Sequence, residues 1–132
     1  MIVLDASAAA DACLEREDRG LWAVDAIAGA GEIHAPHLID TEVVSALRRL
    51  LLAREIARPQ AQAGLELFAR LALERHPAAP LRLRIWELRT RLTAYDATYV
   101  ALAEALGLPL VTTDDRLARA DGHRAEIVAY DS

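Results

Sequence analysis

The sequence contains no lysine, one cysteine and no long apolar run. All 15 basic residues are therefore arginine, and against 20 acidic residues they leave a formal net charge of −5. This balance argues against a broad surface that coats nucleic acid, although a modest basic rim is enough to contact phosphates. The single cysteine, Cys13, excludes an internal disulfide and any cysteine-rich zinc site. We therefore expect a reducing compartment, with the cytoplasm as the default location.

The absence of lysine also excludes enzyme classes that handle phosphate groups. A receiver domain that accepts a phosphoryl group needs a lysine beside its acidic pocket, and a P-loop nucleotidase needs a G-K-[ST] motif. A phosphatase of the haloacid-dehalogenase type needs D-x-D after its first strand, but here Asp5 is followed by Ser7 at that spacing. These three classes do not fit the chain.

No segment has the pattern of a signal peptide or a membrane span. The first residues, MIVLDASAAADACLERED, have no basic lead and are interrupted by Asp5 and Asp11. No stretch approaches about 18 uninterrupted apolar residues. With 132 residues, of which 54 % are hydrophobic, the sequence predicts a single domain, residues 1–132, with one buried core and no membrane association.

The order of the apolar segments predicts an α/β fold. Five short strand candidates occur at residues 2–4, 32–35, 73–76, 110–112 and 127–129, and helical patterns fill the gaps between them. Such alternation is typical of a mainly parallel sheet with helices on both faces. We expect a central sheet of about five strands in a flavodoxin-like order, with the first and fourth strands adjacent.

One predicted helix, in HLIDTEVVSALRRLLLARE, carries an acid at the edge of its apolar stripe. Glu42 lies three residues after Ile39 and four before Ala46, both of which belong to that stripe. A carboxylate at such a half-buried position needs a functional or structural reason. Asp40 lies where the helix begins, and we expect it to cap free backbone N–H groups.

A second predicted helix, in YDATYVALAEALG, places Asp96 in its first turn. Gly107 and Pro109 mark its end. Asp96 falls on the same stripe as Val100 and Ala103, so it is expected to point toward the sheet. The positive end of the helix dipole favours its charged form.

Two further acids follow strands directly. Asp5 comes after the first strand, and Asp114 comes after the fourth. Ligands of open parallel sheets bind outside the carboxyl ends of the strands, where the strand order reverses, so these two acids are expected to meet Glu42 and Asp96 there. Four inward carboxylates would repel one another, and a hard divalent cation such as Mg²⁺ or Mn²⁺ would resolve that conflict and could activate water against a phosphodiester.

Three segments carry a family resemblance when they are taken together: MIVLDASA, PHLIDTEVVSALRR and AYDATYVALAEALGLPLVTTDDRLARA. In this order and at this chain length, the sequence resembles the PIN-domain family, and more narrowly the VapC-type toxins of type II bacterial toxin–antitoxin pairs. The resemblance covers essentially the whole chain. It implies a PIN-like fold and an endoribonuclease that hydrolyses RNA with Mg²⁺ or Mn²⁺.

By position, the family's catalytic and metal-binding quartet falls on Asp5, Glu42, Asp96 and Asp114. In the mechanism that the resemblance implies, the aspartates anchor metal directly or through water, while Glu42 positions or deprotonates the attacking water. The products would carry a 5′-phosphate and a 3′-hydroxyl.

The resemblance also implies supporting residues and partners. Thr112 fills the hydroxyl position of the family's T-x-D pattern and is expected to orient Asp114 or a water on the metal, and Ser7 supports Asp5 in a similar way. A homodimer and a cognate VapB-like antitoxin are the implied partners, with RNA as substrate.

The arginines of LRLRIWELRTRL allow two interpretations. Spacings of seven place Arg82 with Arg89, and Arg84 with Arg91, on one helix. A solvated basic face is the simpler interpretation. The alternative is a rim that contacts RNA phosphates near Asp96, which makes Arg89 and Arg91 candidate RNA contacts.

Each acid also has a structural alternative. Asp5 or Asp114 could cap the helix that follows it, and Asp115 is more readily a cap or a solvated acid than a site residue. The histidines lack a spacing such as i, i+4 on a helix, so we leave them out of the site and expect them in turns or at the surface: His34, His37, His76 and His123. The alternative function is a non-catalytic PIN module that binds metal, RNA or a protein partner through its acidic pocket.

Overall fold

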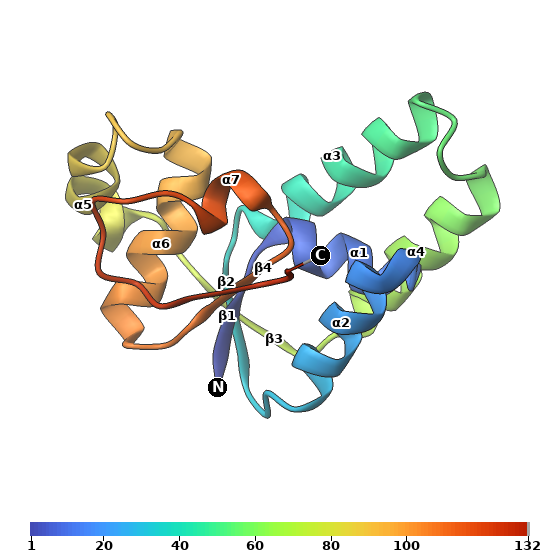
Figure 1. Cartoon of the computed structure of the whole chain (residues 1–132), viewed down its shortest axis with the longest axis horizontal. Coiled ribbons are helices and arrows are strands. Elements are labelled where there is room, and N and C mark those ends of the chain that lie inside the picture. The colour runs from blue at the N-terminus through green and yellow to red at the C-terminus, as the bar shows by residue number, and fades with distance from the viewer. Residues whose placement is uncertain (132) are drawn as a thin grey trace.

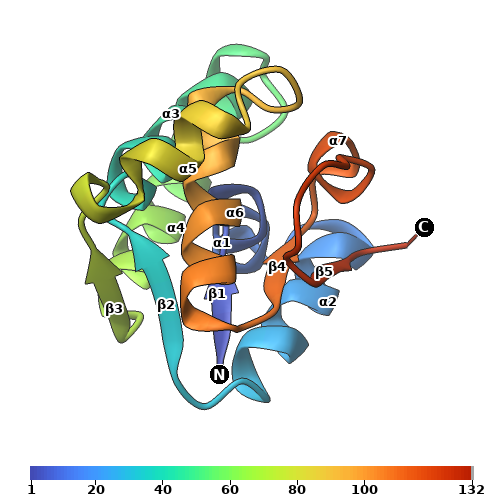
Figure 2. The same ribbon diagram turned by 90° about the vertical axis from the view of Figure 1, so that its left-hand side faces the viewer.

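Five parallel strands form the centre of the molecule in the computed structural model, which describes residues 1–131 (Figures 1 and 2). They are β1 (Ile2–Leu4), β2 (Ile33–Pro36), β3 (Leu73–His76), β4 (Leu110–Thr112) and β5 (Ile127–Ala129). Four strands have the predicted bounds, and β2 begins and ends one residue later than expected. The prediction of an α/β fold around a parallel sheet is confirmed.

Helices cover both faces of this sheet. One layer contains α1 to α4 and the opposite layer contains α5 and α6, while the short α7 lies beyond the end of β4 (Figure 1). The helices are α1 (Ala6–Leu14), α2 (Glu17–Ala28), α3 (Ile39–Leu52), α4 (Arg58–Arg70), α5 (Arg82–Glu87), α6 (Ala94–Leu106) and α7 (Asp115–Ala118), with a 3₁₀ turn at Ala79–Leu81 before α5. In the described part of the chain, no helix is both long and apolar enough to cross a bilayer.

The strand order is β3-β2-β1-β4-β5, which confirms that β1 and β4 are neighbours (Figure 2). It differs from a flavodoxin-like order, 2-1-3-4-5, because β3 extends the sheet beyond β2 instead of lying between β1 and β4. The polar composition of β3 explains this difference in strand order. Strand β3 has the sequence LERH and is only partly buried, so it suits an edge, whereas IVL of β1 and LVT of β4 are buried throughout.

The order in which strands are added to the sheet therefore reverses between β1 and β4. From β1 it builds outward through β2 to β3, and then it returns to the other side of β1 with β4 and β5. Because the strands are parallel, the carboxyl ends of β1 and β4 meet at one edge. This edge is where Asp5 and Asp114 leave the sheet.

The two helices singled out from the sequence form as predicted, apart from one cap. In α3, the stripe of Ile39, Val43 and Ala46 is buried, and α6 ends at Gly107, whose φ of 65° is the left-handed conformation that glycine allows. The prediction that Asp40 caps α3 was wrong, since α3 has no side-chain cap. The Asp40 carboxylate instead accepts two hydrogen bonds, of 2.7 and 2.8 Å, from the guanidinium of Arg75 on β3.

Candidate active site

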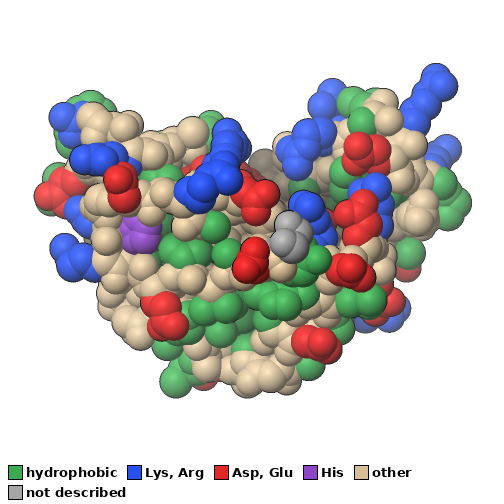
Figure 3. All heavy atoms as spheres, in the orientation of Figure 1, with side chains coloured by type: hydrophobic (Ala, Val, Ile, Leu, Met, Phe, Trp, Pro, Cys, Tyr) green, Lys and Arg blue, Asp and Glu red, His purple; other side chains and the backbone are tan. Residues whose placement is uncertain are grey.

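The carboxyl ends of β1 and β4 open into a cavity of about 810 Å³. In the space-filling view the molecule is hollowed at its upper edge, with arginine and acidic side chains around the hollow (Figure 3). The structure brings all four predicted acids to the wall of this cavity, each from a different element: Asp5 after β1, Glu42 on α3, Asp96 on α6 and Asp114 after β4.

Asp5 is the most buried of these acids, with 5 % of its surface exposed. Its Oδ1 accepts hydrogen bonds from the backbone N–H of Ala8, at 2.9 Å, and from the hydroxyl of Ser7, at 2.8 Å. Asp5 is thus the N-cap of α1, as its structural alternative supposed. The cap also fixes the direction of the carboxylate, so the structural and the functional interpretations of Asp5 do not compete.

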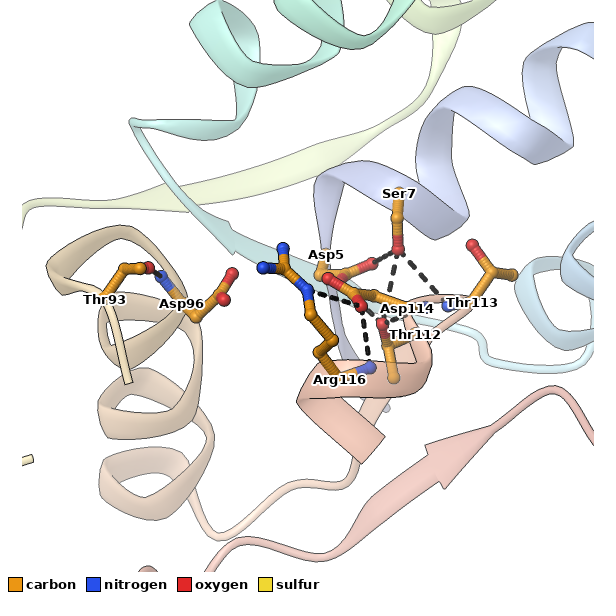
Figure 4. A network of polar contacts seen from close by, with 8 residues as sticks. All are labelled: Asp5, Ser7, Thr93, Asp96, Thr112, Thr113, Asp114 and Arg116. Atoms are coloured by element: carbon orange, nitrogen blue, oxygen red, sulfur yellow. Dashed lines mark hydrogen bonds and ion pairs between the residues drawn. The ribbon is translucent and has the colours of Figure 1, made fainter. Parts of the chain in front are cut away.

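Thr112 connects the two strand ends. Its hydroxyl donates to Oδ2 of Asp5 at 2.7 Å and accepts from the backbone N–H of Asp114 at 2.9 Å. The Ser7 hydroxyl lies 3.3 Å from that of Thr112, and it accepts from the backbone N–H of Thr113 at 3.3 Å (Figure 4). The supporting positions predicted for Ser7 and Thr112 therefore lie in one network with Asp5, and Thr112 orients Asp5 through its side chain and Asp114 through its backbone.

Burial and mutual repulsion raise the pKa of three of the four acids. Burial raises the pKa of Asp5 from 3.8 to about 6, against the opposing effect of its hydrogen bonds, and the charge of Asp114 raises it further. Burial and then the charge of Asp114 raise the pKa of Asp96, while burial and the charge of Asp96 raise that of Glu42. Each of these acids therefore experiences negative charge from another member of the group, which the charge of Arg116 offsets in part at Asp96.

Asp96 and Asp114 are both held at helix starts. Thr93 is the N-cap of α6 and accepts a hydrogen bond of 3.2 Å from the backbone N–H of Asp96, which places that side chain on the cavity side (Figure 4). Asp114 caps α7 by accepting from the backbone N–H of Arg116 at 2.9 Å. The guanidinium of Arg116 lies between Asp96 and Asp114 in Figure 4, with Nε 3.9 Å from Asp114 Oδ1.

The donor set fits a hard divalent cation. The acids offer only carboxylate oxygens, which Mg²⁺ and Mn²⁺ prefer, and a positive ion would relieve the repulsion that raises their pKa values. Among the described residues, no three of these acids bring one oxygen each within 4.8 Å of one another. Direct binding through one or two carboxylates, with waters filling the remaining positions, is the arrangement that this spacing suits.

Tyr99 is a cavity residue that sequence reasoning missed. It lies on α6 one turn after Asp96, is 1 % exposed and lines the cavity. Its buried hydroxyl approaches Glu42 but has no hydrogen bond of good geometry among the described residues. Burial and the charge of Glu42 raise the pKa of this phenol, so it stays protonated and can donate. A tyrosine within an apolar helix is typical of the hydrophobic core, so the sequence around Tyr99 did not indicate a site residue.

The cavity also has a basic rim that the sequence did not reveal. Four arginines line it: Arg16, Arg19, Arg49 and Arg116. Four acids besides the predicted quartet also line the wall: Asp11, Glu17, Glu55 and Asp115. Asp11 accepts a hydrogen bond of 2.6 Å from the Thr113 hydroxyl, and Glu17 pairs with both Arg16 and Arg19. Because the arginines come from α3, α7 and the region around the start of α2, no spacing along the chain links them.

The basic face predicted for residues 82–91 does not form as one helix. Helix α5 ends at Glu87, so Arg89 and Arg91 lie in the turns that follow it. The guanidinium of Arg89 lies 4.3 Å from the Trp86 ring centre, and Arg91 pairs with Asp121 at 2.8 Å. Neither arginine lines the cavity, and RNA contact at these two positions stays a prediction.

Asp115 was expected to be a cap or a solvated acid, and the structure shows it as a solvated acid. It is the first residue of α7, and its side chain is exposed, while its neighbour Asp114 provides the cap. It also reaches the outer wall of the cavity. Adjacent acids thus play different parts because consecutive side chains diverge.

Comparison with known proteins finds a matching family model and curated relatives for this chain. A family model described as PIN domain matches residues 2–123 of the chain. VapC ribonuclease Mb0985 of Mycobacterium bovis is 46 % identical over 119 residues, which cover 89 % of each chain. Ribonuclease VapC1 of Mycobacterium tuberculosis is 45 % identical over 118 residues, covering 79 % of this chain and 89 % of the relative.

A solved structure has the same fold. The crystal structure of VapBC2 from Rickettsia felis, bound to a DNA fragment from its promoter, matches with a TM-score of 0.67 over 99 % of this chain and 100 % of that chain. Their sequences are 19 % identical, so this likeness concerns the fold alone.

Proposed function

The chain belongs to the PIN-domain family, and from that premise we propose that it is a metal-dependent endoribonuclease, the toxin of a VapBC-type toxin–antitoxin pair. The relatives that are 45–46 % identical are named as VapC ribonucleases. The observation that carries the proposal is the convergence of four acids from four separate elements on one cavity, at the point where the strand order reverses.

Asp5, Asp96 and Asp114 are the residues that would hold the ion, Mg²⁺ or Mn²⁺, with Glu42 beside them. Such an ion supplies a lower pKa for water and a positive charge for the phosphodiester oxygens in the transition state. The hydrogen bonds from Ser7, Thr112 and the Ala8 backbone hold the Asp5 carboxylate in one orientation, so no reorientation is needed when a ligand arrives.

Glu42 is the residue that we assign to accept a proton from the attacking water. The pKa of Glu42 is raised above that of an ordinary glutamate and so lies closer to neutral pH. A general base is most effective when its pKa lies near the working pH. The hydroxyl of Tyr99 lies next to Glu42 and remains a donor, so it can keep that carboxylate oriented while the proton moves. Tyr99 therefore acts as a positioning residue in this proposal.

The basic rim would bind the RNA backbone. Arg16 and Arg19 stand on one side of the cavity and Arg49 and Arg116 on others, all within a molecule whose net charge is negative. Such a localised rim recognises phosphates without attracting nucleic acid over the whole surface. The sequence-based candidates Arg89 and Arg91 lie outside this rim and would contact only a longer RNA.

We also propose a homodimer and a VapB-like antitoxin as partners, acting in the cytoplasm. A solved member of the VapBC family of toxin–antitoxin systems from Mycobacterium tuberculosis supports an antitoxin partner, since it is 26 % identical with a TM-score of 0.52 over 97 % of this chain and 95 % of that chain. Light scattering of the isolated chain, and co-purification with the product of a neighbouring small reading frame, test these two partners separately.

The decisive experiment measures cleavage of a pool of structured RNAs by purified protein with Mg²⁺, Mn²⁺ or chelator. Asp96→Asn removes one cavity carboxylate without changing size, and Asp25→Asn is the matched control because Asp25 is an exposed acid on α2 outside the cavity. We expect discrete, metal-dependent cuts from the wild type and Asp25→Asn, and at least a 100-fold loss in Asp96→Asn.

Two outcomes would redirect the proposal. Cleavage by Asp96→Asn at the wild-type rate would show that the cavity acids are not the catalytic group. Metal and RNA binding without cleavage under any condition would favour the non-catalytic PIN module instead.

A further inference from the structure

A second group of metal-binding side chains lies on β2 and β3, at the edge of the sheet. The parallel register pairs His34 with Glu74 and Pro36 with His76. Because side chains alternate between the faces of a strand, His34, Glu74 and His76 share one face. None of these three residues lines the acidic cavity.

The geometry brings one ligand atom from each residue close together. His34 Nδ1 lies 2.9 Å from His76 Nε2 and 3.7 Å from Glu74 Oε2, and the three ligand atoms all lie within 4.8 Å of one another. In a tetrahedral zinc site with bonds of about 2.0–2.2 Å, ligand atoms are about 3.3 Å apart. Small movements of the exposed Glu74 and the half-buried His76 would produce that arrangement.

His34 is oriented in the way that a metal-bound histidine usually is. It is 6 % exposed, which corrects the expectation of a turn or surface residue. Within residues 1–131, its buried Nε2 has no hydrogen bond of good geometry, but a carboxylate oxygen of Glu32 lies 2.6 Å away. A carboxylate at that distance favours a proton on Nε2, and this leaves the lone pair on Nδ1, the atom that faces His76 and Glu74.

The two imidazoles can satisfy each other's facing nitrogens without a metal, but together with Glu74 they are matched to one. Without an ion, the Nε2–H of His76 can donate to Nδ1 of His34. A shift of that proton to the other nitrogen of the His76 ring turns both facing nitrogens into ligands, with no net change of charge. Two imidazoles and one carboxylate, with a carboxylate behind the first imidazole, are a donor set for Zn²⁺ or Co²⁺ rather than for Mg²⁺.

We propose that His34, Glu74 and His76 bind one Zn²⁺-class ion that joins the edge strand β3 to β2, with Glu32 orienting His34 from behind. The site is separate from the acidic cavity in both position and ligand chemistry. Its role is to hold β3, a short and partly exposed strand, against the sheet. The ion would therefore raise thermal stability without taking part in RNA cleavage.

The test is equilibrium dialysis of the tag-free chain against Zn²⁺ in excess Mg²⁺, with metal content measured per chain. We expect one bound Zn²⁺ in the wild type and in Asp96→Asn, and a rise in melting temperature with Zn²⁺. His76→Gln removes a ligand and abolishes this binding, while Glu32→Gln weakens it by about 10–100-fold. His37→Gln is the matched control, because His37 is exposed and lies one residue beyond β2.

Co²⁺ provides a second readout that identifies the ligands. Nitrogen and oxygen ligation gives visible d–d bands without the thiolate charge-transfer band that binding at Cys13 would produce. Glu74→Gln, at an exposed position that folding tolerates, alters this spectrum while circular dichroism stays unchanged. Cleavage of RNA by His76→Gln stays at the wild-type rate.

Three results would overturn the proposal. They are the absence of bound Zn²⁺ in the wild type, equal binding by the wild type and His76→Gln, and loss of binding in Asp96→Asn but not in His76→Gln. The last result would place the ion in the acidic cavity.

Discussion

Asp5→Asn should make the metal-free protein more stable at neutral pH while destroying its activity. Burial raises the pKa of Asp5 from 3.8 to about 6, a difference of about 2 units. At about 1.36 kcal/mol per unit, ionised Asp5 costs the fold about 3 kcal/mol above pH 6. Asparagine removes that charge and keeps an oxygen for the donors Ser7 and Ala8, but it loses the acceptor for Thr112, at a cost of about 1–2 kcal/mol. The expected net gain is about 1–2 kcal/mol.

The pH dependence gives this prediction its sign. Between pH 4 and 6 the folded protein binds more protons at Asp5 than the unfolded chain does, so the wild type loses stability as the pH rises through that window. Asp5→Asn has no such titration. Near pH 4 only the lost acceptor for Thr112 counts, so Asp5→Asn should be about 1–2 kcal/mol less stable than the wild type there. The difference should change sign as the pH rises and reach its full value above pH 6.

Thermal or urea unfolding in chelator, from pH 4 to 8, measures this difference, and Asp25→Asn controls for the loss of one surface charge. We expect Asp5→Asn to melt on the order of 5 °C above the wild type at pH 7.5. Saturating Mg²⁺ or Mn²⁺ should reverse the order, because only the wild type gains the full free energy of ion binding. A variant that melts below the wild type in chelator at pH 7.5, or a difference that does not change with pH, would refute the reasoning.

Three more predictions concern single side chains. Tyr99→Phe should leave the melting temperature nearly unchanged, since no well-formed hydrogen bond is lost, but slow RNA cleavage by about 10-fold; an equal rate would remove Tyr99 from the site. Arg84→Ala should lower the free energy of unfolding in urea by about 2 kcal/mol, because the two hydrogen bonds of Arg84, of 2.7 and 3.0 Å, neutralise Glu104, whose side chain is 5 % exposed. Adding Glu104→Gln to Arg84→Ala should recover part of that loss. If the effects of the two substitutions simply add, the pairing is contradicted. Thr112→Val should cost about 1–3 kcal/mol and most of the cleavage rate, while Thr112→Ser keeps both, and an active Thr112→Val would show that the link to Asp5 is dispensable.

Much of the fold could be predicted because strands and helix ends depend on near neighbours. Four strands were predicted with their observed bounds, and Gly107 ends α6 as expected. Competition between partners is harder to predict. Asp40 is well placed for a cap, but Arg75 on β3 binds it instead. The strand order also differs from the expected one, since the choice of β3 as an edge depends on which strands compete for burial on both faces.

The sequence by itself determined that four acids would follow strand ends or face inward from helices, because each position is set by the local period of its own element. Tertiary structure alone decided what surrounds them and which distant residues meet elsewhere in the fold. The buried hydroxyl of Tyr99, the arginine rim and the pairing of His34 with His76 join residues far apart along the chain. His34 and His76 are 42 residues apart and meet only because β2 and β3 are paired in a particular register. That register follows from the packing of the whole sheet, which no short stretch of sequence contains.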